Sequence, residues 1–144
     1  MDIGFISDAV QEIVQVKINM LNGEAAQSVK KASSPDDWRD EMQTITINAG
    51  RRMGHTTALH ELSKKHPDML IIVRNEALRR NLVKDMNTKC RVLHMAGVNE
   101  RLAFEMMRGA EHSIIAIDDW SAVQADIDLE YIYACLPTIV LLLG

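Results

Sequence analysis

The stretch TITINAGRRMGHTTALHELSKKH, residues 44–66, passes from an apolar run through a glycine-containing turn into a helical pattern. TITIN (44–48) has the length and composition of a strand, and residues 56–66 have apolar side chains at helical spacing. The turn between them, AGRRMG (49–54), holds two glycines and two arginines. This order of strand, turn and helix predicts the first half of a βαβ unit.

Four more apolar runs of strand length follow along the chain. They are MLIIV (69–73), RVLHM (91–95), SIIAI (113–117) and TIVLLL (138–143). Helical patterns separate the runs, at residues 56–66, 75–86, 99–109 and 121–135. Alternation at these lengths predicts right-handed βαβ units, and near-continuous apolar strands are typical of a sheet covered on both faces. The expected fold class is α/β, a parallel sheet of about five strands with helices on both faces and ligands at the carboxyl ends of the strands.

The residues ahead of this core predict a helical segment. A first helix is expected from Ser7, as its cap, to about Leu21, with Gly23 ending it. A polar helix is expected over residues 24–31, and SSPDDW predicts another helix capped by Ser34.

The length and composition predict one globular domain of 144 residues, with a helical preface at 1–43 and the sheet at 44–144. The formal net charge of −4 gives no overall attraction to nucleic acid or to an anionic membrane. Cys90 and Cys135 lack the spacing of a paired motif and are expected to be buried, reduced thiols. No signal-peptide pattern and no membrane-spanning run is evident, so we expect a cytoplasmic location without membrane contact.

The turn after the first strand lies where a phosphate-binding loop would open a helix. Backbone N–H groups and the helix dipole would there face the phosphates. The usual pattern, G-x-x-x-x-G-K-[ST], places Ala49 at the first glycine, matches Gly54 and Thr56, and has His55 in place of the lysine. The residues expected to bind nucleotide here are Gly50, Arg51, Arg52, Gly54, His55, Thr56 and Thr57. The alternative is an ordinary glycine-containing turn.

A pair of acids ends the fourth apolar run, in SIIAIDDW (113–120). In P-loop ATPases the acid at the end of this strand holds Mg²⁺, and the next acid polarises the attacking water. We therefore expect Asp118 and Thr56 to hold the metal, and Asp119 to be the catalytic acid. The alternative is that the two acids cap and charge the first turn of a helix that starts near Ser121.

These motifs resemble those of large-terminase packaging ATPases. AGRRMGHTT is similar to their phosphate-binding loop, in which an early arginine and a missing first glycine are common. PDDWRDEM resembles the upstream segment whose Trp-Gln pair places the adenine, which implies nucleotide binding by Trp38, although Arg39 follows it. PTIVLLLG resembles the strand before the motif that couples hydrolysis to DNA movement. The resemblance covers residues 35–144 and implies a P-loop fold, ATP and Mg²⁺ as ligands, a phage or mobile-element origin, and the host cytoplasm as location.

Two departures from that family bear on hydrolysis. Lysine is a flexible, permanently charged donor, whereas His55 is shorter and only partly charged near neutrality. A lost charged donor costs about 3 kcal/mol, or two orders of magnitude in rate. Asp119 stands where a glutamate is usual and is one methylene shorter. We expect binding to survive and hydrolysis to be slow or absent, with Arg51 or Arg52 either replacing the lysine or remaining solvated.

Basic residues cluster at and after the end of the second predicted strand. They are Arg74, Arg79, Arg80 and Lys84. In related helicase-like ATPases this region contacts nucleic acid, so the resemblance implies a nucleic-acid partner. The alternative is a solvated helix face. No histidine pair has ligand spacing with a third donor, so no metal other than Mg²⁺ is expected.

Three functions remain open at the level of sequence. The first is a nucleotide-binding P-loop protein related to terminase and helicase ATPases, a slow Mg²⁺-dependent ATPase if it is active. The second is a pseudo-ATPase, a non-catalytic interaction module that binds a host or phage protein or nucleic acid. The third, a small nucleotide kinase, is disfavoured because no cluster of arginines follows the acidic strand.

Overall fold

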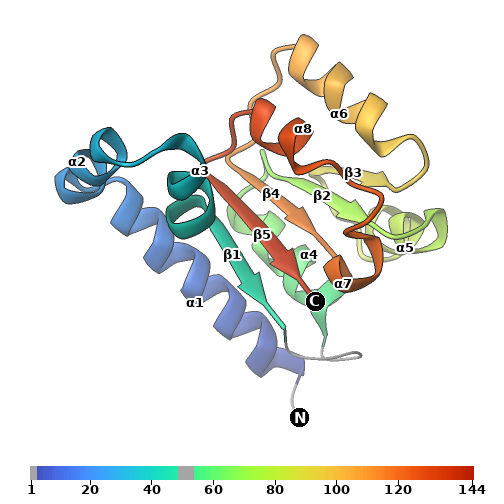
Figure 1. Ribbon diagram of the computed structural model, residues 1–144. Helices are drawn as coiled ribbons and strands as arrows, with labels where there is room; N and C mark the ends of the chain where they lie inside the picture. The colour runs from blue at the N-terminus through green and yellow to red at the C-terminus, as the bar shows by residue number, and fades with distance from the viewer. Residues whose placement is uncertain (1–2, 49–53) are drawn as a thin grey trace.

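Five short apolar strands form one parallel sheet (Figure 1). The strands are β1 (Thr44–Ile47), β2 (Leu70–Val73), β3 (Arg91–His94), β4 (Ile114–Ile117) and β5 (Ile139–Leu143). They lie in the order β1-β5-β4-β2-β3, and every pair of neighbours is parallel. The computed structural model describes residues 3–48 and 54–144. It confirms the α/β class and all five predicted strands.

Helices and helical turns connect the strands and precede them. They are α1 (Ile3–Leu21), α2 (Glu24–Ala32), α3 (Pro35–Trp38), α4 (His55–Lys65), α5 (Glu76–Arg80), α6 (Val98–Met107), α7 (Trp120–Val123) and α8 (Leu129–Ala134), with π-helical turns η1 (Arg39–Gln43) and η2 (Asn81–Asp85). Within the described ranges, none of these helices has the length and apolar character needed to cross a bilayer.

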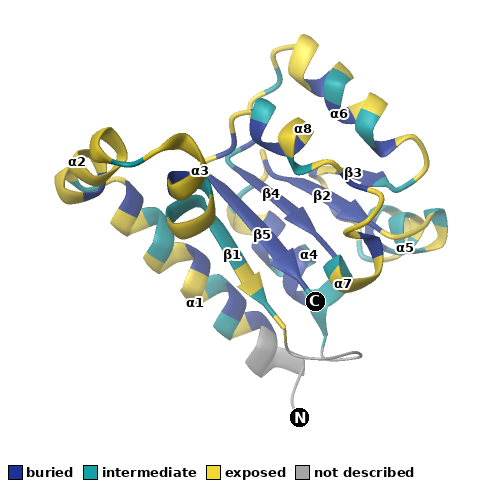
Figure 2. Cartoon of the chain, in the orientation of Figure 1, coloured by how far each residue is buried: buried dark blue, intermediate teal, exposed yellow. Residues whose placement is uncertain are grey.

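Two hydrophobic cores lie on opposite faces of the sheet. Residues of α1, α4 and η2 pack on one face, and residues of α6, α7 and α8 pack on the other. Successive residues of β2 alternate between the cores, with Ile71 and Val73 in the first and Leu70 and Ile72 in the second. β2, β4 and β5 are buried along their whole length, whereas β1 at the edge is partly exposed (Figure 2). This double cover explains why the inner strands are continuous apolar runs.

The first helix starts earlier than its sequence pattern predicted. Helix α1 begins at Ile3, so the predicted role of Ser7 as its cap is wrong. Ser7 shares a helical stripe with Val10 and Val14, and all three side chains are buried. Packing on the core therefore fixes this serine inside the helix. Ser34 does cap α3 as predicted, because its side chain accepts a hydrogen bond from the Asp37 N–H at 3.2 Å.

The helix predicted over residues 121–135 is divided into α7 and α8. The side chain of Asn99, on α6, is bonded to both sides of the break. Its Nδ2 donates to the Asp126 carbonyl at 3.4 Å, and its Oδ1 accepts from the Asp128 N–H at 3.1 Å. The Asp128 side chain then accepts from the Glu130 N–H at 3.0 Å and caps α8. Contacts with α6 thus stabilise the non-helical segment between α7 and α8. The spacing of apolar residues along 121–135 does not predict such a break, because it contains no information about another helix.

The Asn99 side chain gives a test of this explanation. Asn99→Ala removes both bonds to the backbone between α7 and α8, so we expect the free energy of unfolding to fall by about 1 to 2 kcal/mol. Urea denaturation measures this change. Gln124→Ala, at the exposed position just after α7, is the control and should change stability by less than about 0.5 kcal/mol. Equal effects of the two substitutions would contradict the explanation.

Candidate functional site

The carboxyl edge of the sheet has a topological switch point between β2 and β4. These strands are neighbours, yet the helix that follows β2 packs on one face and the helix that follows β4 packs on the other. Parallel α/β sheets bind ligands in the crevice at such a point. A ligand site is therefore expected at the carboxyl ends of the neighbouring strands β1, β5, β4 and β2.

The start of α4 lies close to the end of β4. Gly54 precedes α4 with φ of 80°, a left-handed conformation that favours glycine. Two residues later, the Thr56 hydroxyl lies close enough to the Asp118 carboxylate to lower its pKa. The two predicted metal ligands, Thr56 and Asp118, thus lie near each other.

Asp118 is a buried carboxylate, with only 6% of its surface exposed. Burial raises its pKa, while the nearby His55 imidazole, the Asp119 N–H and the Thr56 hydroxyl act in the opposite direction. The Asp119 N–H donates to Asp118 Oδ1 at 2.9 Å. The net shift is upward, so holding the charged form at this position costs folding free energy.

His55, at the first position of α4, lies close enough to Asp118 to affect the pKa of that carboxylate. Its Nε2 atom is buried and, among the described residues, has no hydrogen-bond partner. A buried ring nitrogen without a partner is rare and often marks a functional position. The imidazole is therefore available to donate to, or accept from, a ligand in the crevice.

Asp119 has an unusual backbone conformation and a cationic partner. Its φ is 56°, in the left-handed region, which aspartate tolerates better than most residues. Arg74, just after β2, donates from Nη1 to Asp119 Oδ2 at 3.0 Å. The Asp119 side chain makes no capping bond to α7. Asp119 thus occupies the N-cap position of α7, as in the alternative interpretation, but its side chain bonds Arg74 and not the helix.

Three further residues meet at this edge and were not singled out from the sequence. The Gly144 N–H, after β5, donates to the Ile47 carbonyl at 2.8 Å. A Cβ atom at Gly144 would lie 3.1 Å from Ser121 Oγ and 3.3 Å from the Asn48 side chain. Asn48 and Gly144 are the first residues beyond β1 and β5, and that position is the signal in the sequence that could have identified them.

Not every predicted nucleotide-binding residue is found at this edge. Gly50, Arg51 and Arg52 lie outside the described residues. Trp38 precedes β1, at the opposite end of the strand from α4, and is buried in the core. The Lys30 ammonium lies 5.6 Å from the centre of its ring. The structure thus does not bring Trp38 together with Thr56 and Asp118.

The basic cluster is largely paired with carboxylates. Besides the Arg74 pair, Glu76 accepts from Arg79 at 2.6 Å and lies 3.4 Å from Arg80. The hydrogen bond from Arg79 is the main reason why the pKa of Glu76 falls to about 2. His94 Nε2 is 3.2 Å from the same carboxylate. Lys84 is exposed on η2. Nucleic acid at this surface would have to compete with these ion pairs.

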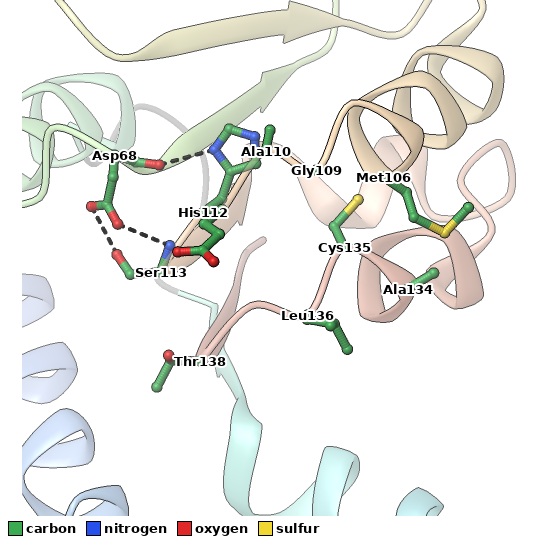
Figure 3. A pocket seen from close by; sticks show the side chains of 11 residues that line it. Asp68, Met106, Gly109, Ala110, His112, Ser113, Ala134, Cys135, Leu136 and Thr138 are labelled. Atoms are coloured by element: carbon green, nitrogen blue, oxygen red, sulfur yellow. Dashed lines mark hydrogen bonds between the residues drawn. The ribbon is translucent and has the colours of Figure 1, made fainter.

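A separate hollow of about 420 Å³ lies at the amino ends of β4 and β5 (Figure 3). Asp68 holds its wall, because its carbonyl is 2.9 Å from His112 Nδ1 and its carboxylate accepts from Ser113. Burial raises the pKa of the Cys135 thiol in this wall, which disfavours the nucleophilic thiolate. Cys90 and Cys135 are both free and buried, as predicted. The hollow therefore offers no activated nucleophile among its described residues, and we place the candidate site at the carboxyl edge.

A metal ion at the carboxyl edge would not be held by protein side chains alone. Across the described ranges, no three side chains of His, Cys, Asp or Glu are grouped to hold a metal ion. Mg²⁺ in phosphate sites uses one or two protein oxygens together with substrate phosphates and water. Thr56 and Asp118 offer oxygens of this kind.

Comparisons of the chain with models of known protein families, with curated proteins and with solved structures found no match. The interpretation of the site therefore depends on its geometry.

The raised pKa of Asp118 predicts how stability depends on pH. The folded chain binds this proton more tightly than the unfolded chain, so the Asp118 contribution to stability falls as pH rises through the interval between the two pKa values. Asp118→Asn has no such charge and keeps an oxygen for the Asp119 N–H. We expect the variant to be more stable than the wild type at pH 7, with the difference shrinking as pH falls towards about 4.

Urea denaturation at several pH values measures this difference. Asp126→Asn, at an exposed position, is the control and should show no comparable gain at pH 7. An Asp118→Asn variant that is less stable than the wild type at pH 7 would contradict the proposed cost of the buried carboxylate.

Proposed function

We propose that the chain is a nucleotide-binding protein of the P-loop type that binds ATP with Mg²⁺ and hydrolyses it slowly or not at all. The observation that carries the proposal is the proximity of the Thr56 hydroxyl to the Asp118 carboxylate. It places a hydroxyl at the start of the helix after β1 beside a carboxylate at the end of β4. A phosphate-bound magnesium ion requires these two oxygen donors to be together.

The start of α4 supports the binding of a polyphosphate. The first N–H groups of an α-helix have no partner within the helix, and its dipole favours negative charge at this end. The first turn of α4 contains no acidic residue, and Lys64 and Lys65 lie in its last turn. The amino end of α4 therefore carries no acidic side chain that would repel a bound anion.

Magnesium fits the residues that are present. Thr56 and Asp118 supply hard oxygen ligands, and a cation would offset the cost of the buried carboxylate. When bound, the ion would offset the negative charge of the phosphates. The chain's own residues would then hold the ion and orient the phosphates.

Slow hydrolysis follows from the surroundings of Asp119 and His55. Asp119 is paired with Arg74 at 3.0 Å, so its carboxylate is held by a cation instead of being free to polarise water. His55 supplies a ring nitrogen beside Asp118 where a lysine would supply a permanent charge. Both differences weaken the chemical step more than they weaken binding.

The pseudo-ATPase remains the second candidate. It is favoured by apolar side chains on the exposed side of α1, at Ile13, Val16 and Met20. The predicted nucleic-acid contacts of Arg74, Arg79, Arg80 and Lys84 remain a proposal. A pure interaction module would bind no nucleotide, and calorimetry separates the two functions.

Calorimetric titration with ATP tests the binding proposal. The wild type should bind ATP more tightly with Mg²⁺ than with EDTA, and Thr56→Ala should abolish most of that difference because the metal loses a ligand. Thr46→Ala, an exposed threonine in β1, is the matched control and should behave like the wild type. No heat of binding to the wild type under either condition would favour the interaction module.

Restoring the usual residues tests the proposal about hydrolysis. The double variant His55→Lys with Asp119→Glu should raise steady-state phosphate release by about a hundredfold, the size of one charged donor. Adding Arg74→Ala should raise it further, because the carboxylate then has no cationic partner. Rapid turnover by the wild type would overturn the account of a weakened site.

A further inference from the structure

Helix α1 carries two apolar stripes, and only one of them faces the core. Val10, Val14 and Leu21 are buried against the body of the protein. Ile13, Val16 and Met20 are 43%, 60% and 47% exposed. At about 100° per residue, the second stripe lies roughly 105° around the helix from the first.

The exposed stripe has the spacing of a coiled-coil seam. Steps of three and then four residues place Ile13 and Met20 at positions a and Val16 at position d of a heptad. In the same register, Glu12 occupies position g and Lys17 occupies position e, on either side of the seam. Within its own chain the Lys17 ammonium donates to the Glu41 carbonyl at 3.2 Å, so pairing with Glu12 of a second copy would exchange this contact. Side chains at e and g set the partner and the orientation in such pairs.

We propose that α1 pairs with α1 of a second copy of this chain, in parallel, through Ile13, Val16 and Met20. In a parallel pair, position g faces position e of the partner five residues further along. Glu12 of each copy therefore meets Lys17 of the other, and the two-fold axis makes this ion pair twice. In an antiparallel pair g faces g and e faces e, so these opposite charges would no longer be matched.

The rest of the fold leaves room for this arrangement. Figure 1 shows α1 on the outer side of the molecule, alongside the edge strand β1. The residues of α1 that pack on the core point away from the proposed seam, so the two sheets would lie on opposite sides of the helix pair. The pairing does not depend on nucleotide binding.

An interface this small should give a weak, reversible dimer. Sedimentation velocity on the chain at concentrations from roughly 1 to 500 µM tests for it. Val16→Asp should raise the dissociation constant at least about tenfold, since it places a charge in the seam. Val16 is exposed in the single chain, so the variant should keep the unfolding midpoint of the wild type. Met107→Asp is the matched control, at a methionine 80% exposed on α6, and should leave the dimer unchanged.

Exchange of the flanking charges tests the orientation. Glu12→Lys and Lys17→Glu should each weaken the dimer, because each places like charges together across the seam. The double variant with both changes should return the dissociation constant to within about threefold of the wild type. A wild type that stays monomeric at every concentration, a dimer unaffected by Val16→Asp, or a double variant that remains as weak as the singles would each overturn the proposal.

Discussion

Thr56, at the start of the helix after β1, lies near Asp118, at the end of β4, although β1 and β4 are not neighbours in the sheet. β5 lies between β1 and β4, so α4 must begin at a level from which Thr56 reaches beyond β5. The strand register makes this reach short, because Ile47 pairs with Leu143 and Leu142 pairs with Ile117. The three strands therefore end almost level, and the residues just beyond them gather in one place.

Several local costs of the fold lie at the carboxyl edge. Three of them lie close together in space: the buried carboxylate of Asp118 with its raised pKa, the positive φ of Asp119, and the buried ring nitrogen of His55, which has no partner among the described residues. Elsewhere, buried charge is compensated. Burial raises the pKa of Glu105, but hydrogen bonds from Arg108 and Arg91 outweigh it and hold the pKa below its usual value. Costs of this kind also occur at the opposite end of the strands, where His112 Nε2 is buried without a hydrogen-bond partner among the described residues and Leu136 has a φ of 55°. What distinguishes the carboxyl edge is the buried carboxylate of Asp118 beside an imidazole and a hydroxyl.

The five strands could be predicted from the sequence because each is a short apolar run. A run of this kind must be buried, and a strand covered on both faces of a sheet buries it. It did not predict strand order, and without strand order the pair of Arg74 with Asp119 cannot be inferred. The break after α7 depends on Asn99 of another helix, and periodicity along one segment does not contain it. The spacing of Glu76 from Arg79 and Arg80 does predict ion pairs on a helix. The pairing of these two arginines with a carboxylate could therefore have been predicted from the sequence.

Backbone and side-chain NMR during titration with Mg²⁺ and ATP tests the central claim most directly. The account predicts that the largest shifts fall on the amides of residues 54–57 and 118–119 and on the ring nitrogens of His55. Amides around the hollow near His112 and Thr138, at the other end of the strands, should move little. Shifts concentrated at that opposite end, or none at the start of α4, would contradict a nucleotide site built on Thr56 and Asp118.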